Sequence, residues 1–178
     1  SVEEKLKELF LVSLNKNDLS FDREKLMAAM EHADGILCTV SDKITKEIIE
    51  TSSRRAKIIA NFGVGVDNID LETAKKNEII VTNTPDVLTE ATVDIATLLL
   101  LSVTRNAFHS EMMIRLGKWK GFSLVNNLGM DLRGKTIGII GMGRIGRSFA
   151  KRANQAFGMK VLYFNRSPVT DLEFEANV

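Results

Sequence analysis

Apolar and polar positions alternate in blocks along this chain, and the blocks predict strands and helices in turn. Short apolar runs bounded by polar or glycine-containing segments are typical of buried strands, whereas longer blocks with amphipathic spacing are typical of helices. The predicted strands cover residues 10–14, 35–39, 56–60, 79–81, 135–140 and 160–164. The predicted helices cover residues 2–9, 22–31, 45–51, 71–76, 89–104, 107–116 and 144–157. This alternation predicts an α/β fold with parallel sheets covered by helices.

The character of the chain changes near Pro85, which favours an extended conformation for Thr84 and predicts a crossing between two domains. A long apolar stretch follows at residues 95–103. It is too short to span a bilayer, and it predicts a helix buried on most sides, either in a core or in an oligomer interface. Residues 117–134 are polar and loop-like, and Trp119 is their expected anchor.

Composition and charge exclude several classes of protein. The 178 residues carry 24 Lys and Arg against 23 Asp and Glu, so the formal net charge is +1 and no nucleic-acid-binding surface is expected. The N-terminal residues lack the apolar core of a signal peptide, and no membrane segment is expected. Cys38 is the single cysteine, which excludes an internal disulfide and fits the reducing cytoplasm. No spacing typical of metal ligands occurs, so no metal site is expected.

A glycine-rich motif gives the strongest chemical signal. The sequence from Gly141 to Gly146 is G-x-G-x-x-G, and it follows a predicted strand, opens a helix and leads to a second strand. Gly141 permits a tight turn, Gly143 leaves the backbone open to a pyrophosphate, and Gly146 lets the helix pack closely. The free N–H groups at the start of that helix favour phosphate. The motif predicts a dinucleotide site, and a glycine-rich turn that only packs is the alternative.

The residues that close the second strand bear on the choice of nucleotide. An NAD site places an acidic residue about 20 positions after the motif, where it binds the ribose hydroxyls. This chain has Asn165, Arg166 and Ser167 there. The neutral Asn165 does not repel a 2′-phosphate, Arg166 offers charge-assisted hydrogen bonds and Ser167 offers a hydroxyl. The sequence therefore favours NADP(H), with NAD(H) as the alternative if Arg166 is an ordinary surface charge.

A second loop, residues 61–67, follows the predicted strand at 56–60 and contains Gly63 and Gly65. Ligands of open parallel sheets bind beyond the carboxyl ends of the strands. Two glycines at that place expose backbone N–H groups, which suit an anion such as a carboxylate. A tight loop with glycine at positive φ is the other interpretation.

Several linked motifs, in order, resemble the D-isomer-specific 2-hydroxyacid dehydrogenases. They lie at residues 63–70, 81–85, 117–119 and 132–146, and the resemblance runs from about residue 35 to residue 167. Residues 84–92 are most similar to the glyoxylate and hydroxypyruvate reductase branch. The resemblance implies a flavodoxin-like substrate domain at residues 1–86, lacking its first strand, and the N-terminal part of a Rossmann NADP-binding domain at residues 87–178.

The resemblance also implies roles for single residues. Val64 and Gly65 would bind a substrate carboxylate through backbone N–H groups, and Thr39 and Val40 would lie in a substrate-side loop. The implied cofactor-binding residues are Gly141, Gly143, Arg144, Ile145, Gly146, Asn165, Arg166 and Ser167. The family's catalytic Arg, Glu and His motifs have no match here, so no residue of this chain is assigned a catalytic role.

The implied activity is the NADPH-dependent reduction of a small 2-keto acid, glyoxylate or hydroxypyruvate, to the D-2-hydroxy acid in the cytoplasm. An NAD-linked phosphoglycerate- or lactate-type dehydrogenase is one alternative, and a catalytically inactive nucleotide-binding or scaffold fragment is another. Because the family usually dimerises through its cofactor domain, we expect a homodimer through residues 89–116 or else a poorly soluble chain. The missing motifs predict a piece of a protein about twice as long.

Overall fold

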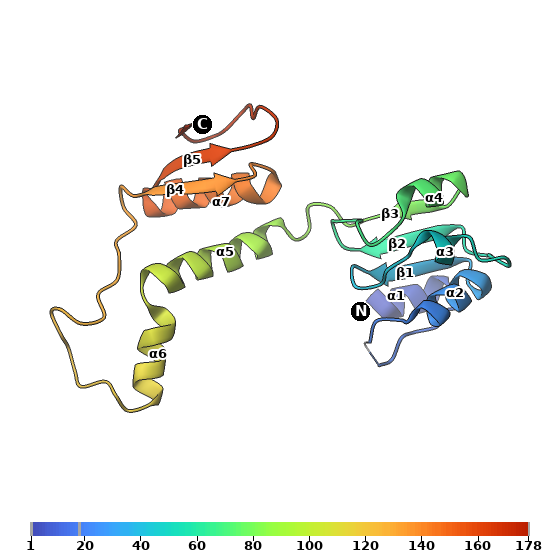
Figure 1. Cartoon of the computed structure of the whole chain (residues 1–178), viewed down its shortest axis with the longest axis horizontal. Helices are drawn as coiled ribbons and strands as arrows, with labels where there is room; N and C mark the ends of the chain where they lie inside the picture. The colour runs from blue at the N-terminus through green and yellow to red at the C-terminus, as the bar shows by residue number, and fades with distance from the viewer. Residues whose placement is uncertain (1, 18, 178) are drawn as a thin grey trace. The chain divides into compact units, whose positions relative to one another are not determined.

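The chain divides into two compact units, residues 1–85 and 86–178, next to the boundary expected from the sequence. The computed structural model describes residues 2–17 and 19–177. Each unit contains a three-stranded parallel sheet with helices packed against it (Figure 1). The predicted α/β fold with parallel sheets is therefore confirmed.

The first unit alternates helices and strands in chain order. Its elements are α1 (Val2–Leu9), α2 (Arg23–His32), β1 (Gly35–Thr39), α3 (Lys46–Ile49), β2 (Ile58–Phe62), α4 (Leu71–Lys76) and β3 (Ile80–Thr82). The sheet order is β1-β2-β3, with Gly35 opposite Ile58 and Ile58 opposite Ile80. Since all three strands run in parallel, their carboxyl ends meet at one edge of the sheet.

Carboxylates begin two of these helices. The side chain of Asp22 caps the N-terminus of α2, where it accepts a hydrogen bond from the Lys25 N–H at 2.9 Å. Asp70 does the same at the start of α4, where the Thr73 N–H lies 2.9 Å from its Oδ1. These N–H groups favour the ionised form and hold the pKa of each carboxyl below its ordinary value of 3.8.

Acid should therefore weaken the first unit through its helix caps. A carboxyl whose pKa is lowered by folding stabilises the fold above its unfolded pKa, and this contribution is lost as the pH falls through the folded pKa. We expect Asp70→Asn, which keeps an acceptor but does not titrate, to lose less stability than the wild type between about pH 5 and pH 3. Urea denaturation at the two pH values measures this, and equal acid sensitivity of the two proteins would contradict it.

Among the described residues, helices cover one face of the first sheet and leave the other face open. Cys38 and Ile59 point into a core of buried side chains contributed by α2, α3 and α4. The neighbouring positions in the strands point the other way, and Leu37, Ile80 and Phe62 are 58%, 61% and 65% exposed. Parallel sheets are normally covered on both faces, and no described residue of this unit covers this apolar face.

The second unit begins with two helices and ends in a second sheet. Its elements are α5 (Thr89–Thr104), α6 (Ala107–Arg115), β4 (Thr136–Ile140), α7 (Arg144–Phe157), β5 (Lys160–Phe164) and β6 (Ala176–Asn177). The sheet order is β4-β5-β6, and α7 packs on the face that carries Ile139 and Val161. Gly158 ends α7 at φ +62°, in the left-handed conformation that favours glycine. The opposite face again exposes apolar side chains, Ile140, Leu162 and Phe164.

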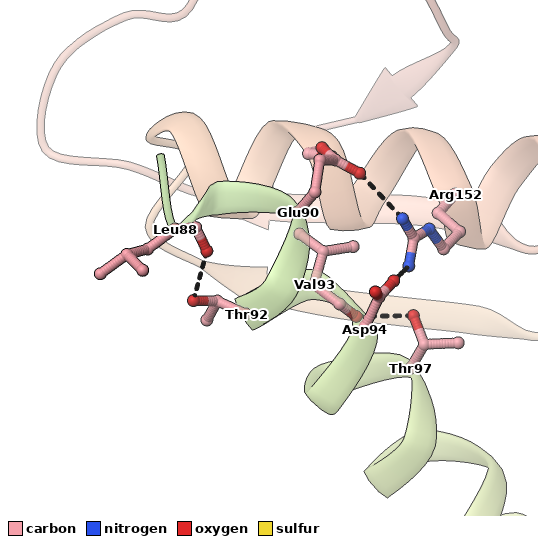
Figure 2. Close-up of polar contacts among 8 residues, drawn as sticks. Leu88, Glu90, Thr92, Val93, Asp94, Thr97 and Arg152 are labelled. Carbon is pink, nitrogen blue, oxygen red and sulfur yellow. Dashed lines mark hydrogen bonds and ion pairs between the residues drawn. The ribbon is translucent and has the colours of Figure 1, made fainter. Parts of the chain in front are cut away.

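A polar clamp and an apolar contact hold α5 against α7. The guanidinium of Arg152 in α7 bonds to the carboxylates of Glu90 and Asp94 in α5, and Figure 2 shows it between them. Ser148 donates a hydrogen bond to Glu90 Oε1 at 2.5 Å. Further along α5, Leu100 and Leu101 pack on the buried cluster of Leu132, Ala153 and Met159. One side of α5 is thereby fixed, while its other side remains exposed.

That exposed side corrects one of the two interpretations of residues 95–103. Ile95, Leu98, Leu99 and Val103 are each more than half exposed, so this stretch is not buried in the core of its own chain. The reason is geometric, since α5 packs against α7 and α6, and these four side chains lie where neither helix covers them. The second interpretation, burial in an oligomer interface, stays a prediction.

Three smaller predictions were wrong. Residues 10–14 form no strand, because Phe10 continues the last turn of α1 through a 2.8 Å bond to the Leu6 carbonyl. The strand predicted at residues 56–60 exists but is displaced along the chain, and it runs from Ile58 to Phe62. It begins later than predicted because the Ala56 N–H donates to the Met30 carbonyl and not to a neighbouring strand. Trp119 anchors nothing, because it is 62% exposed and belongs to none of the buried clusters in the described chain.

Candidate functional site

Two loops meet at the carboxyl end of the first sheet. One begins at Thr39, the last residue of β1, and continues with Val40, and the other follows β2 and carries Val64 and Gly65. A Cβ atom at Gly63 would lie 2.4 Å from Cγ1 of Val40, so only glycine lets the loops approach this closely. The structure therefore brings the four predicted substrate-side residues to the same edge of the sheet.

The exposed groups of these loops differ in what they can still bind. Asp42 Oδ2 accepts hydrogen bonds from both donors of Thr39, its backbone N–H at 2.8 Å and its hydroxyl at 3.1 Å. Thr39 thus has no donor left for a ligand, whereas the neighbouring Val40 side chain is 56% exposed. The N–H groups of Val64 and Gly65 donate no hydrogen bond to any described residue. The loop therefore has N–H donors without a partner in the described chain, and their binding of an anion stays a prediction.

Three asparagines beside this loop were not among the predicted site residues, namely Asn61, Asn68 and Asn83. Asn61 lies in the strand itself and is 2% exposed, and its amide bonds to the Gly65 carbonyl at 2.7 Å. Asn83, after β3, donates to the Val64 carbonyl at 2.9 Å. Asn68 donates to the carbonyls of Thr39 and Asp42 at 3.2 and 3.1 Å and so joins the two loops. An amide at the end of an otherwise apolar strand was the available signal.

The glycine-rich turn joins β4 to α7 in the second unit. Gly141 adopts φ +96°, a conformation that residues other than glycine rarely adopt. At Gly146 a Cβ atom would lie 2.1 Å from the Gly141 carbonyl oxygen, so the helix packs directly on the turn. At Gly143, which caps the helix, a Cβ atom would meet nothing within 4 Å. The backbone beside Gly143 is therefore open, and Arg144 and Ile145 begin the helix there.

Asn165 fixes the shape of this turn. Its Oδ1 accepts a hydrogen bond from the Met142 N–H at 3.0 Å, and its Nδ2 donates to the Ser167 carbonyl at 2.8 Å. The amide thus ties the end of β5 to the glycine-rich turn. A hollow of about 380 Å³ lies beside it, lined by Ile140, Gly141, Phe164, Asn165, Arg166 and Ser167. Four of the eight predicted cofactor residues line this one hollow.

The two arginines of the site differ in their partners. Arg144 Nε lies 2.5 Å from Asp86 Oδ1, in an exposed ion pair. Arg166 forms no ion pair or hydrogen bond with any other described residue. An unneutralised guanidinium at the rim of the hollow favours a ligand with a phosphate there.

Other candidate chemistry is sparse in the part of the chain that the structure describes. No three His, Cys, Asp or Glu side chains in residues 2–17 and 19–177 are placed to hold a metal ion. Cys38 is buried, and burial raises the pKa of its thiol to about 11, so it stays protonated at neutral pH. Within those same residues no helix alone has the length and apolar character to cross a membrane. Only α5 and α6 taken together do, by length and composition, with a bend of 68° between them.

Comparison with known proteins assigns the chain to a family. Residues 2–163 match the model for the catalytic domain of D-isomer-specific 2-hydroxyacid dehydrogenases. A glyoxylate reductase of Pyrococcus horikoshii is 42% identical over 176 residues, which are 97% of this chain and 52% of that protein. The chain thus spans about half the length of this curated relative.

Solved structures agree with the sequence match. A protein from Thermus thermophilus superposes with a TM-score of 0.89 at 41% identity, over 97% of this chain and 55% of that one. An acyclic imino acid reductase in complex with NADPH and D-Arg has a TM-score of 0.85 at 29% identity, over 98% of this chain and 55% of that one. A D-lactate dehydrogenase of Aquifex aeolicus, complexed with NAD and lactic acid, has a TM-score of 0.79 at 30% identity, over 96% of this chain and 49% of that one. The chain belongs to the D-isomer-specific 2-hydroxyacid dehydrogenase family and resembles its glyoxylate reductases.

Proposed function

We propose that the protein to which this chain belongs reduces a small 2-keto acid, glyoxylate or hydroxypyruvate, with NADPH. The observation that carries this proposal is the turn from Gly141 to Gly146. The helix packs tightly on the turn at Gly146, while the space beside the backbone of Gly143 is open to a ligand. Such a turn at a helix N-terminus suits a pyrophosphate. The family and the resemblance to glyoxylate reductases support the class of substrate.

The residues of this chain would bind and orient the two reactants. The N–H groups of Val64 and Gly65 would hold the substrate carboxylate, with Val40 beside it. Gly143, Arg144 and Ile145 would contact the pyrophosphate, and the nicotinamide would supply a hydride when bound. A proton for the new hydroxyl needs an acid group. No residue of this chain is assigned that role, so we place it in the part of the family's length that this chain does not span.

The residues that line the hollow support the proposed preference for NADPH over NADH. No acidic side chain lines the hollow, and Asn165 presents a neutral amide where a carboxylate would repel a 2′-phosphate. Arg166 is free of partners in the described chain and can pair with that phosphate. Among the structural relatives one was solved with NADPH and another with NAD, so the family admits both.

Arg166→Asp tests this preference. We expect the substitution to weaken NADPH binding by about 10- to 100-fold, because a charged hydrogen bond is lost and a repulsion is added, and to leave NADH binding nearly unchanged. Fluorescence titration with both nucleotides measures the ratio. Lys160→Asp, the same change of charge at the amino end of the same strand, is the matched control and should not alter it. An unchanged ratio in the Arg166 variant would refute the role of this side chain.

Turnover separates the enzyme from a nucleotide-binding protein. In a full-length protein that contains this chain and the remaining half of the family's length, NADPH oxidation is followed with glyoxylate and with hydroxypyruvate beside the same fluorescence titration. Binding without turnover would favour the second candidate, a nucleotide-binding or scaffold role, which the unassigned proton donor supports. Preference for NADH with phosphoglycerate- or lactate-type substrates would favour the NAD-linked alternative.

We also propose that the chain forms a homodimer through residues 89–116. The support is the exposed side of α5, together with Phe108, Ile114 and Leu116 in and after α6, which are each more than half exposed. Apolar surface of this extent is typical of a protein interface. A cytoplasmic location remains a prediction.

A further inference from the structure

We propose that Asn61, assisted by Asn83, is a positioning residue that turns the N–H groups of the loop at residues 63–66 outward toward an anion. The inference rests on the proposed function, in which this loop binds the substrate carboxylate. It adds a role for two side chains that do not themselves reach the substrate.

Three successive carbonyl groups of the loop are bound by the surrounding chain. The Gly63 oxygen accepts from the Thr84 N–H at 3.0 Å, and the Val64 oxygen accepts from Asn83 Nδ2 at 2.9 Å. The Gly65 oxygen accepts from Asn61 Nδ2 at 2.7 Å. Each of these three peptide planes is therefore held by its oxygen.

Peptide geometry then fixes the direction of the N–H groups. The described chain has no cis peptide, and in a planar trans peptide the N–H points opposite to the carbonyl of the preceding residue. The N–H groups of Val64, Gly65 and Val66 thus point away from Thr84, Asn83 and Asn61 respectively. None of the three donates a hydrogen bond to another described residue. Successive free N–H groups of this kind make a concave anion site.

Asn61 is itself held in place from both ends of its amide. Its Oδ1 accepts from the Cys38 thiol at 3.4 Å and from Asn68 Nδ2 at 3.2 Å, while its Nδ2 reaches the Gly65 oxygen. The side chain is 2% exposed, so its orientation is set by these partners and not by water. The amide supplies both the donor and the acceptor used here, whereas leucine has neither and an ionised aspartate only accepts.

Two substitutions separate the contributions to individual peptide planes. Asn61→Leu is neutral and similar in size, and it releases the Gly65 carbonyl and hence the Val66 N–H. Asn83→Ala, at an exposed position, releases the Val64 carbonyl and hence the Gly65 N–H. A general loss of stability would not produce this residue-specific pattern. If Asn61→Leu fails to fold, Asn83→Ala still tests the same mechanism.

The experiment is a glyoxylate titration of the whole chain, followed by the backbone amide signals in NMR spectra. In the wild type the signals of Val64, Gly65 and Val66 should move with glyoxylate. We expect Asn61→Leu to raise the glyoxylate Kd by about tenfold, with the shift at Val66 reduced most, and Asn83→Ala to reduce the shift at Gly65 most. Asn77→Leu is the matched control, because its amide also donates to a carbonyl, that of Thr73 at 2.9 Å, after α4.

Failure of this inference and failure of the proposed function give different results. If wild-type signals move and both variants bind glyoxylate as tightly as the control, the positioning role is overturned while the carboxylate contact stands. If no wild-type signal moves, the carboxylate contact is overturned. In that case the positioning role is tested by measuring amide relaxation without glyoxylate. If Asn61 holds the loop, Gly65 and Val66 are more mobile in Asn61→Leu than in the wild type. Equal mobility in the two proteins overturns the positioning role.

Discussion

Replacing Gly146 with alanine is expected to destabilise the second unit by about 3 kcal/mol, even though alanine is the better helix former. The gain in helix propensity is only about 1 kcal/mol. Against it, the new methyl group would lie 2.1 Å from the Gly141 carbonyl oxygen and 3.2 Å from its carbonyl carbon. Both atoms are backbone, so relief requires α7 to move away from the turn. We therefore expect NADPH binding to be lost as well.

Gly143→Ala is the matched control for this experiment. A methyl group at residue 143 meets nothing within 4 Å, so the free energy of unfolding should change by no more than about 1 kcal/mol. NADPH binding should still fall, by at least about tenfold, because the methyl group occupies space that the pyrophosphate needs. Urea denaturation and fluorescence titration of both variants measure the two effects. Equal stability of the Gly146 variant and the wild type would contradict the tight packing of this turn.

Ile95→Asp combined with Leu99→Asp should convert a dimer of this chain into monomers. The two side chains are four residues apart on the same side of α5 and are 57% and 59% exposed. Burial of each in an interface contributes about 2 kcal/mol, and the replacements would have to bury unpaired carboxylates, so the dissociation constant should rise by a thousandfold or more, to order of magnitude. Sedimentation velocity at equal protein concentrations measures the change.

A charge placed on the uncovered face of the first sheet is the control for the dimer experiment. Ile80→Asp changes a residue that is 61% exposed but lies in the other unit, and it should leave the dimer intact. If the wild-type chain sediments as a soluble monomer, the proposed interface is wrong. Dissociation by Ile80→Asp alone would move the interface to the first sheet.

Local signals in the sequence were sufficient for most of the elements. The bounds of β1, α4, α5, α7 and β5 agree with the prediction, because apolar runs of the right length and capping residues such as Asp70 specify them within a few positions. β6 was not predicted, since Ala176 and Asn177 carry no apolar run and become a strand only by pairing with β5.

The remaining differences depend on contacts between distant residues. Nothing near Asn165 in sequence shows that its amide would bind the Met142 N–H, 23 positions away. Likewise the link from Asn61 to the Gly65 carbonyl depends on how the loop after β2 turns back over the strand. The exposure of Trp119 and of one side of α5 reflects which segments are present to cover them, and this is a property of packing and not of local pattern.

The strand order bears on how the chain acquires its fold during synthesis. In both sheets each strand pairs with the next one along the chain, and each sheet draws its strands from one unit alone among the described residues. Contacts between near neighbours form quickly, and domains generally fold as units with the N-terminal one first. The β1-β2-β3 sheet can therefore assemble on the ribosome before β4 has been translated.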